Sequence, residues 1–142
     1  MNMELPHAEP IKLISEYQLQ DNSVKASYTI PIDHPVLAGH FPHIAVWPGV
    51  YIIEGMNQTA GIHALNSAKK STDEEIDLTK IITFVTSIDK VKFREPCFPG
   101  DTLEYTAELV KQKANHMFYA CKVFKNNRQI SSATVGLTAK KL

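Results

Sequence analysis

The sequence predicts an α+β fold in which one curved antiparallel sheet wraps around a single long central helix. Two strand-like segments are followed by one long helical segment and then by four strand-like segments. The helical segment is apolar around most of its circumference, which is typical of a buried helix. Strand-like residues 102–109 alternate polar and apolar, as in a sheet with one buried and one wet face. A sheet curled around the helix buries both apolar surfaces.

The first two strands are predicted at residues 11–20 and 23–32, with Asp21-Asn22 as the turn between them. In the second strand, apolar residues alternate with polar ones from Val24 to Ile30. The next stretch, residues 33–48, contains several residues that interrupt regular structure: Pro35, Gly39, Pro42 and Pro48. We expect a structured loop there, and its length makes it a candidate functional segment.

The long helix is predicted at about residues 48–69. Pro48 suits a first helical turn, and Lys69 with Lys70 suits the negative end of the helix dipole. The apolar run is interrupted by four polar residues, which argues against a membrane span: Glu54, Asn57, Gln58 and His63.

The remaining chain is predicted to complete the sheet. Residues 71–79 are acidic and polar, and we interpret them as a solvated loop. Four strands follow at about 81–93, 102–112, 116–125 and 128–139. This order is that of the hot-dog fold, and residues 1–142 are predicted to form a single hot-dog domain. One helix and one sheet leave an open sheet edge, which favours a dimer joined along that edge.

The composition limits the partners. Fifteen Lys and Arg balance 15 Asp and Glu, so no global field favours nucleic acid or a membrane. Cys97 and Cys121 lack metal-ligand spacing and are expected to be reduced and structural. The histidines share no such spacing either, so neither a metal nor another cofactor is expected: His34, His43, His63 and His116. Residues 1–10 have no signal-peptide pattern, which favours a cytoplasmic protein.

An ordered set of short motifs surrounds the start of the helix. Gly39-His40-Phe41-Pro42 lies in the loop, Pro48-Gly49-Val50 opens the helix, and residues 54–58 read Glu-Gly-Met-Asn-Gln. His40 precedes Pro48 by eight positions and Glu54 by fourteen. In these motifs the chain resembles the FabZ-type 3-hydroxyacyl-(acyl-carrier-protein) dehydratases, which show G-H-F-P, P-G-V and E-A-M-A-Q at the same spacing. The resemblance covers roughly residues 10–140.

The resemblance implies dehydration of a 3-hydroxyacyl thioester, carried on acyl carrier protein, to the trans-2-enoyl thioester in fatty-acid or polyketide/polyene-type biosynthesis. The reaction removes a weakly acidic proton from C2 and helps hydroxide leave from C3, so it needs a base and an acid. His40 fits the base, because imidazole titrates near neutral pH. Glu54 fits the acid, since burial on an apolar helix disfavours its charged form.

Further roles follow from the same resemblance. The Gly49 N–H, at the helix N-terminus, is expected to hold the thioester carbonyl, and Gln58, one turn beyond Glu54, is expected to orient the carboxyl. The family forms its His–Glu pair across a dimer interface, which implies a homodimer or a trimer of dimers. The substrate pocket is assigned to Phe41, Pro42, Trp47 and Val50.

Structural interpretations stand beside these roles. A loop histidine often bonds backbone carbonyls, Gly49 also fits a simple helix start, and Gln58 fits a structural role equally well. The basic cluster of Lys90, Lys92 and Arg94 fits either an acidic carrier protein or an ordinary exposed strand face. Five aromatic residues are expected in the core or the dimer interface, some of them lining an acyl tunnel: Tyr51, Phe84, Phe93, Phe118 and Tyr119.

The chain also departs from the family pattern. Residues 43–47 read His-Ile-Ala-Val-Trp, where the family has Gly, a variable residue, Pro, an aliphatic residue and Met. This bulkier loop predicts an altered acyl preference. Gly55 and Asn57 replace two alanines. The alternative functions are a hot-dog acyl thioesterase and a non-catalytic acyl-binding subunit. Isomerisation after dehydration is less favoured, because the FabA-like branch typically has Asp where this chain has Glu54.

Overall fold

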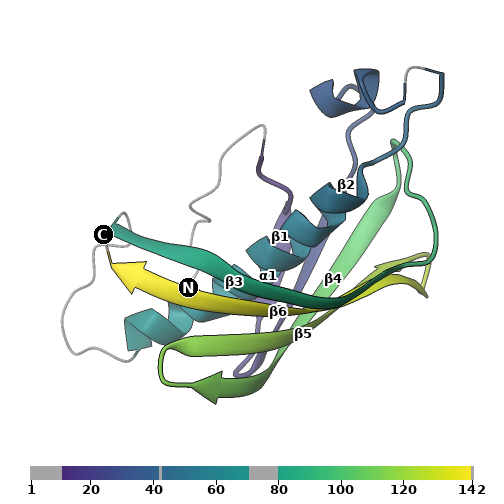
Figure 1. The fold of residues 1–142 in the computed structure, drawn as a ribbon. Helices are drawn as coiled ribbons and strands as arrows, with labels where there is room; N and C mark the ends of the chain where they lie inside the picture. Colours follow the sequence, from purple (N-terminus) through teal and green to yellow (C-terminus); the bar gives the residue numbers. More distant parts are fainter. Residues whose placement is uncertain (1–10, 42, 71–79, 142) are drawn as a thin grey trace.

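The computed structural model describes residues 11–41, 43–70 and 80–141, and its ribbon is drawn in Figure 1. The long helix, α1, spans Gly49–Lys70. Six strands accompany it: β1 (Glu16–Leu19), β2 (Ser23–Thr29), β3 (Ile81–Phe93), β4 (Thr102–Lys113), β5 (His116–Lys125) and β6 (Arg128–Lys141). The described residues therefore confirm the predicted order of two strands, one long helix and four strands.

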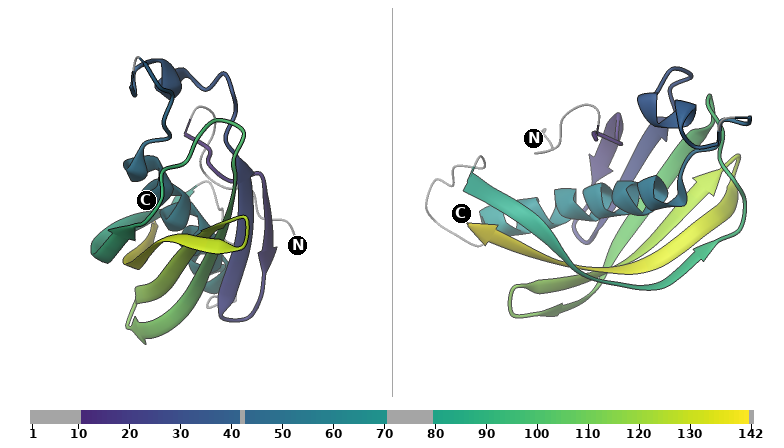
Figure 2. Two further views of the ribbon diagram at one scale, coloured as in Figure 1. Left: turned by 90° about the vertical axis from the view of Figure 1, so that its right-hand side faces the viewer. Right: turned by 45° about the horizontal axis from the view of Figure 1, so that its top comes forward.

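The strands form one antiparallel sheet in the order β1-β2-β4-β5-β6-β3. The sheet curves around α1, which runs along its concave side (Figure 2). Because β3 follows the helix and pairs with β6, it lies at the far edge from β1. The predicted hot-dog fold is confirmed, and one edge of the sheet is formed by the long β3 strand.

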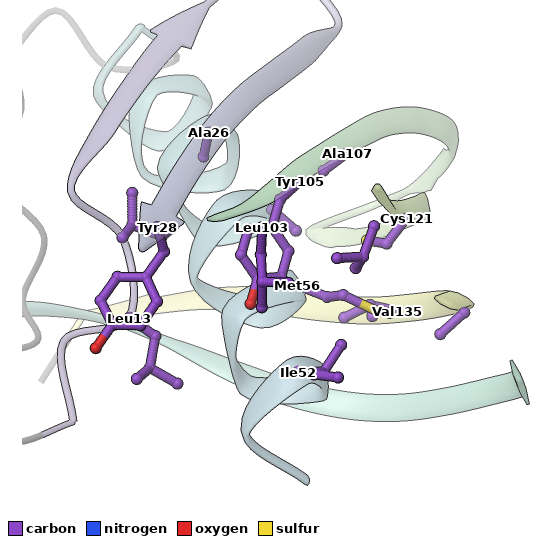
Figure 3. Close-up of a cluster of buried hydrophobic side chains, with 14 of the residues drawn as sticks. Leu13, Ala26, Tyr28, Ile52, Met56, Leu103, Tyr105, Ala107, Cys121 and Val135 are labelled. Atoms are coloured by element: carbon purple, nitrogen blue, oxygen red, sulfur yellow. The ribbon is translucent and has the colours of Figure 1, made fainter. Parts of the chain in front are cut away.

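The core lies between the helix and the concave face of the sheet. Helix and strand lie close together here, and Ile52 and Met56 of α1 belong to the same buried cluster as Leu103 and Tyr105 of β4 (Figure 3). Gly55 allows this close approach, because a Cβ at this position would collide with the ring of Tyr105. Packing therefore explains Gly55, which is one of the two residues that replace alanines of the family motif in the helix.

The first two strands are shorter than predicted. β1 begins at Glu16 instead of residue 11, and β2 ends at Thr29 instead of residue 32. Two residues upstream of β1 are bonded to the helix through Gln58, since the Leu13 N–H donates to Gln58 Oε1 at 2.9 Å and Gln58 Nε2 donates to the Ile11 carbonyl at 2.7 Å. The alternation of apolar and polar residues in the sequence does not reveal whether the backbone bonds to the helix or to a neighbouring strand.

The predicted loop after β2 contains a short 3-10 helix, η1 (Pro35–Ala38). His34 caps it, because its Nδ1 accepts a hydrogen bond from the Val36 N–H at 3.2 Å. The loop and the start of α1 lie at the same end of the molecule (Figure 1). Pro42 and the predicted acidic loop 71–79 lie outside the described residues.

Three of the five aromatic residues are not in the core of this chain: Phe84, Phe93 and the half-buried Phe118. Tyr119 is fully buried, whereas Phe84 and Phe93 of the edge strand β3 are 40% and 49% exposed. Val85 and Ile88 on the same strand are also exposed, at 42% and 39%. An apolar surface therefore follows the open edge of the sheet. No helix among the described residues is both long and apolar enough to cross a bilayer.

Candidate active site

His40 is held by the loop in which it lies. Its Nδ1 is 3.0 Å from the Val46 carbonyl oxygen, and the Val46 N–H donates to the His40 carbonyl at 3.0 Å. A carbonyl oxygen only accepts, so Nδ1 carries the hydrogen in this contact. In a neutral imidazole, Nε2 is then the nitrogen with the free lone pair. The loop thus fixes the ring tautomer that can act as a base through Nε2.

A cavity of about 300 Å³ adjoins His40. The buried Trp47 lines it, and the backbone N–H of Trp47 donates to the Cys97 carbonyl at 2.8 Å. Gly49, at the first position of α1, also lines it, and a Cβ there would lie 3.2 Å from the ring of Phe93. The remaining lining residues are Val46, Ile52, Phe93, Arg94, Glu95, Pro96 and Cys97.

The far wall of this cavity is the segment between β3 and β4, and Lys125 of β5 holds it in place. Lys125 Nζ donates to the Pro96 carbonyl at 3.0 Å and lies 3.3 Å from Asp101 Oδ2. The same Asp101 oxygen accepts from the Phe98 N–H at 2.8 Å. Lys125 is buried, so its charge needs these partners.

Glu54 is the second predicted reacting group, and it lies half-buried on α1. Gln58 Nε2 donates to Glu54 Oε1 at 3.1 Å, and Asn57 Nδ2 donates to Glu54 Oε2 at 3.4 Å. Donors of this kind favour the ionised carboxylate. The burial argued from the sequence acts in the opposite direction, and it is weaker than expected because the carboxylate side chain is not fully buried.

Gln58 is fixed in one orientation. It is completely buried, its Oε1 accepts from the Leu13 N–H, and its Nε2 donates to the Ile11 carbonyl at 2.7 Å. The second hydrogen of Nε2 points to Glu54. Gln58 therefore ties residues 11–13 to the helix and also contacts the Glu54 carboxyl, and its predicted role in orienting that carboxyl stays a prediction.

Among the described residues, the cavity beside His40 is not lined by Glu54. Ile52 lines the cavity of His40, and Glu54 follows two residues later, which is a rotation of about 200° around the helix. A larger hollow of about 640 Å³, bordered by β1, β2 and β4, contains none of the predicted site residues.

The predicted pocket residues are divided. Trp47 lines the cavity, whereas Phe41 and Val50 are 57% and 68% exposed and do not line it. Phe41 stacks on the His40 ring, with ring centroids 4.4 Å apart. Pro42 lies outside the described residues. Phe41 and Val50 thus present apolar surface outward at the end of the molecule that holds His40.

His63 and the two cysteines are buried, and the structure shows their contacts. The buried His63 contacts the Tyr119 hydroxyl at 2.7 Å and the Asp21 carbonyl at 2.8 Å. Both cysteines are free and buried, and burial raises the pKa of the Cys97 thiol to about 11. Within residues 11–41, 43–70 and 80–141, no three His, Cys, Asp or Glu side chains gather as metal ligands would.

Two parts of the site were not found from the sequence. Residues 94–97 line the cavity, although the sequence predicts only a structural thiol at Cys97. Asn57 contacts Glu54, although in the sequence it is only a departure from the family pattern. Its spacing of three residues from a helical carboxylate is a signal that predicts this contact. No local pattern predicts the approach of residues 94–97 to the loop.

Comparisons with known proteins identify the family of this chain. The FabA-like domain family matches residues 5–134. The chain is 35% identical over 131 residues to the 3-hydroxyacyl-(acyl-carrier-protein) dehydratase FabZ of Campylobacter lari, which covers 91% of this chain and 87% of the relative. It is 47% identical over 111 residues to the enzyme of the same name from Helicobacter pylori, covering 77% and 69%.

Solved structures support the fold. The dehydratase heterocomplex ApeI:P from Xenorhabdus doucetiae is similar with a TM-score of 0.75 and 20% identity, covering 96% of this chain and 88% of that one. A hypothetical thioesterase from Streptococcus pneumoniae with coenzyme A gives a TM-score of 0.65 at 12% identity, covering 89% and 85%. These structures share the fold, and the sequence relationship decides the family. On the match over residues 5–134, this chain belongs to the FabA-like family.

Proposed function

We propose that this protein dehydrates a 3-hydroxyacyl thioester, carried on acyl carrier protein, to the trans-2-enoyl thioester. The observation that carries this proposal is the hydrogen bond between His40 Nδ1 and the Val46 carbonyl, which leaves Nε2 as the basic nitrogen beside a cavity. The relationship to dehydratases named for this reaction supports it.

In the proposed reaction, His40 Nε2 removes a proton from C2 of the substrate. The C2–H electron pair forms the C2–C3 double bond, and the C3–O bond breaks with a proton from Glu54, so that water leaves. The Gly49 N–H, at the start of α1, donates to the thioester carbonyl as it gains negative charge. Proton exchange with solvent then restores both side chains.

The working pair is proposed to form across a dimer. Ile52 and Glu54 face directions about 200° apart on α1, so a second copy supplies the carboxyl to each His40 cavity. The exposed apolar residues of β3, together with Phe41 and Val50, offer surface for this contact. The dimer is the proposed catalytic unit, and a trimer of dimers is compatible with it.

The carrier protein and the acyl chain are further parts of the proposal. Lys90, Lys92 and Arg94 are exposed, and Arg94 also lines the cavity of His40, which suits the approach of an acidic carrier. The bulky Trp47 in the cavity wall supports an acyl preference different from that of the common family pattern. Two free cysteines suit a reducing compartment, and we place the protein in the cytoplasm.

A product assay tests this function. The protein is incubated with 3-hydroxyacyl carrier-protein thioesters of several chain lengths, and mass spectrometry detects loss of one water. His40→Ala is expected to lower the rate by about 10²- to 10⁴-fold. His43→Ala is the matched control, because His43 is exposed in the same loop.

Three results would contradict the proposal. Release of free thiol without an enoyl product would indicate a thioesterase. Turnover of no substrate would favour an acyl-binding subunit. An unchanged rate in His40→Ala would exclude this histidine as the base.

A further inference from the structure

We propose that Asn57 is a positioning residue that, together with Gln58, holds the Glu54 carboxyl between two amide donors and stabilises the carboxylate formed when Glu54 gives up its proton. This inference rests on the proposed function, because it assigns Glu54 the role of acid. It gives a role to a residue that the sequence comparison marked only as a replacement for alanine.

The contacts divide the two oxygens of the carboxyl between two amides. Gln58 Nε2 is 3.1 Å from Glu54 Oε1, and Asn57 Nδ2 is 3.4 Å from Glu54 Oε2. Both donors come from the same helix as Glu54, at positions three and four residues later, so they need no other element to reach it. The two amides are neutral, and they favour the ionised form of the carboxyl by donation alone.

Asn57 differs from Gln58 in what else it contacts. Gln58 has two backbone partners, Leu13 and Ile11, and thus also holds the chain together. Among the described residues, the buried Asn57 Oδ1 has no hydrogen-bond partner. A buried carbonyl without a partner destabilises the fold. Folding stability therefore does not explain Asn57, whereas an amide directed at the acid does.

The proposed effect is on proton donation. When Glu54 transfers its proton to the leaving hydroxyl, negative charge appears on the carboxyl, and donors already in place stabilise it without reorganisation. Because Asn57 Nδ2 donates to Glu54 Oε2 and Asn57 Oδ1 is buried, we expect Asn57 to act through Glu54. Its loss is expected to lower kcat and to leave KM nearly unchanged.

Two variants separate hydrogen bonding from packing. Asn57→Ala removes the amide, and Asn57→Leu replaces it with an apolar side chain of similar size. Both are expected to lower kcat about tenfold, with KM changed less than about threefold. Asn57→Leu is expected to melt at or above the temperature of the natural protein, since it removes the unpaired carbonyl. Asn66→Leu is the matched control, because Asn66 is half-buried on the same helix about 13 Å farther along.

A second measurement does not depend on turnover. The Glu54 carboxyl is followed by carbon-13 NMR during a pH titration of the dimeric protein, with the resonance assigned by its absence in Glu54→Gln. Loss of a donor to the charged form raises the titration midpoint, by about half a unit to one unit in both Asn57 variants. Asn66→Leu is expected to leave the midpoint unchanged.

The outcomes distinguish this inference from the proposed function. A raised midpoint together with lower kcat supports it. An unchanged midpoint overturns it, whether or not the protein dehydrates a substrate. If dehydration occurs and Asn57→Leu retains the natural kcat, the inference is also overturned, even with Glu54 established as the acid. If no substrate turns over, the proposed function fails, and the midpoint alone decides whether Asn57 is a donor to Glu54.

Discussion

Glu54 and His40 occupy surroundings of opposite kinds. Glu54 lies on a buried helix, and amide donors from the same helix contact both of its oxygens. His40 lies in a loop, its ring is oriented by one backbone carbonyl, and its neighbours Phe41 and Ile44 are 57% and 63% exposed. The carboxyl part of the site is therefore organised within one chain. The imidazole part has an open side, which a second subunit is proposed to cover.

The largest effect is expected from separating the two parts. His40→Ala and Glu54→Gln are each expected to lose most activity, because each removes one of the two proton-transfer groups. Mixing the two inactive variants under conditions of subunit exchange should restore about a quarter of the natural activity. Half of the dimers would be mixed, and each of these would contain one intact site of two. Activity measured after mixing, with each variant alone as the control, tests this. No recovery despite demonstrated exchange would place both groups in one chain.

A smaller loss of activity is expected when only the contacts that hold the Glu54 carboxyl are removed. Gln58→Ala removes the partners of the Leu13 N–H and the Ile11 carbonyl, so the free energy of unfolding should fall by about 1–3 kcal/mol. The rate should fall about tenfold, because one oxygen of Glu54 loses its donor. Urea unfolding and the dehydration assay measure these two losses.

Gln18→Ala is the control for that experiment, since Gln18 is exposed on β1. Equal stability of Gln58→Ala and the natural protein would show that residues 11–13 do not depend on Gln58. The carboxyl part of the site would then not depend on the contacts of Gln58 with residues 11–13.

The smallest effect concerns Cys97, which lies in the far wall of the cavity beside His40. Burial raises the pKa of this thiol to about 11, so below that pH it is mostly the unreactive thiol in the folded protein. Alkylation by iodoacetamide should be slow at about pH 8 and should rise about tenfold per pH unit, because the thiolate fraction does. Mass spectrometry of labelled peptides, with the denatured chain as the control, measures it. Folded and denatured rates that agree at pH 8 would indicate a more open cavity.

Much of the fold could be predicted from local patterns. The long helix was predicted from its apolar positions, from Pro48 at its start and from the lysines at its end, and its observed bounds differ by one residue at each end. The four later strands were placed within two residues, since clear turn residues separate them. The first strand was predicted too long, because residues 11–13 bond to the helix through Gln58 and their sequence does not reveal this partner.

The sequence by itself determined the fold class, the family resemblance and the two proton-transfer candidates, because these depend on periodicity and on ordered motifs along the chain. Only the tertiary structure decided which nitrogen of His40 carries hydrogen, which segment walls its cavity, and that Ile52 lies on the helix face turned to this cavity. These properties depend on how the loop, the helix and residues 94–97 pack against one another, and short motifs do not specify this packing. For Asn57, the spacing from Glu54 was visible in the chain, but its unpaired carbonyl required the packed core around it.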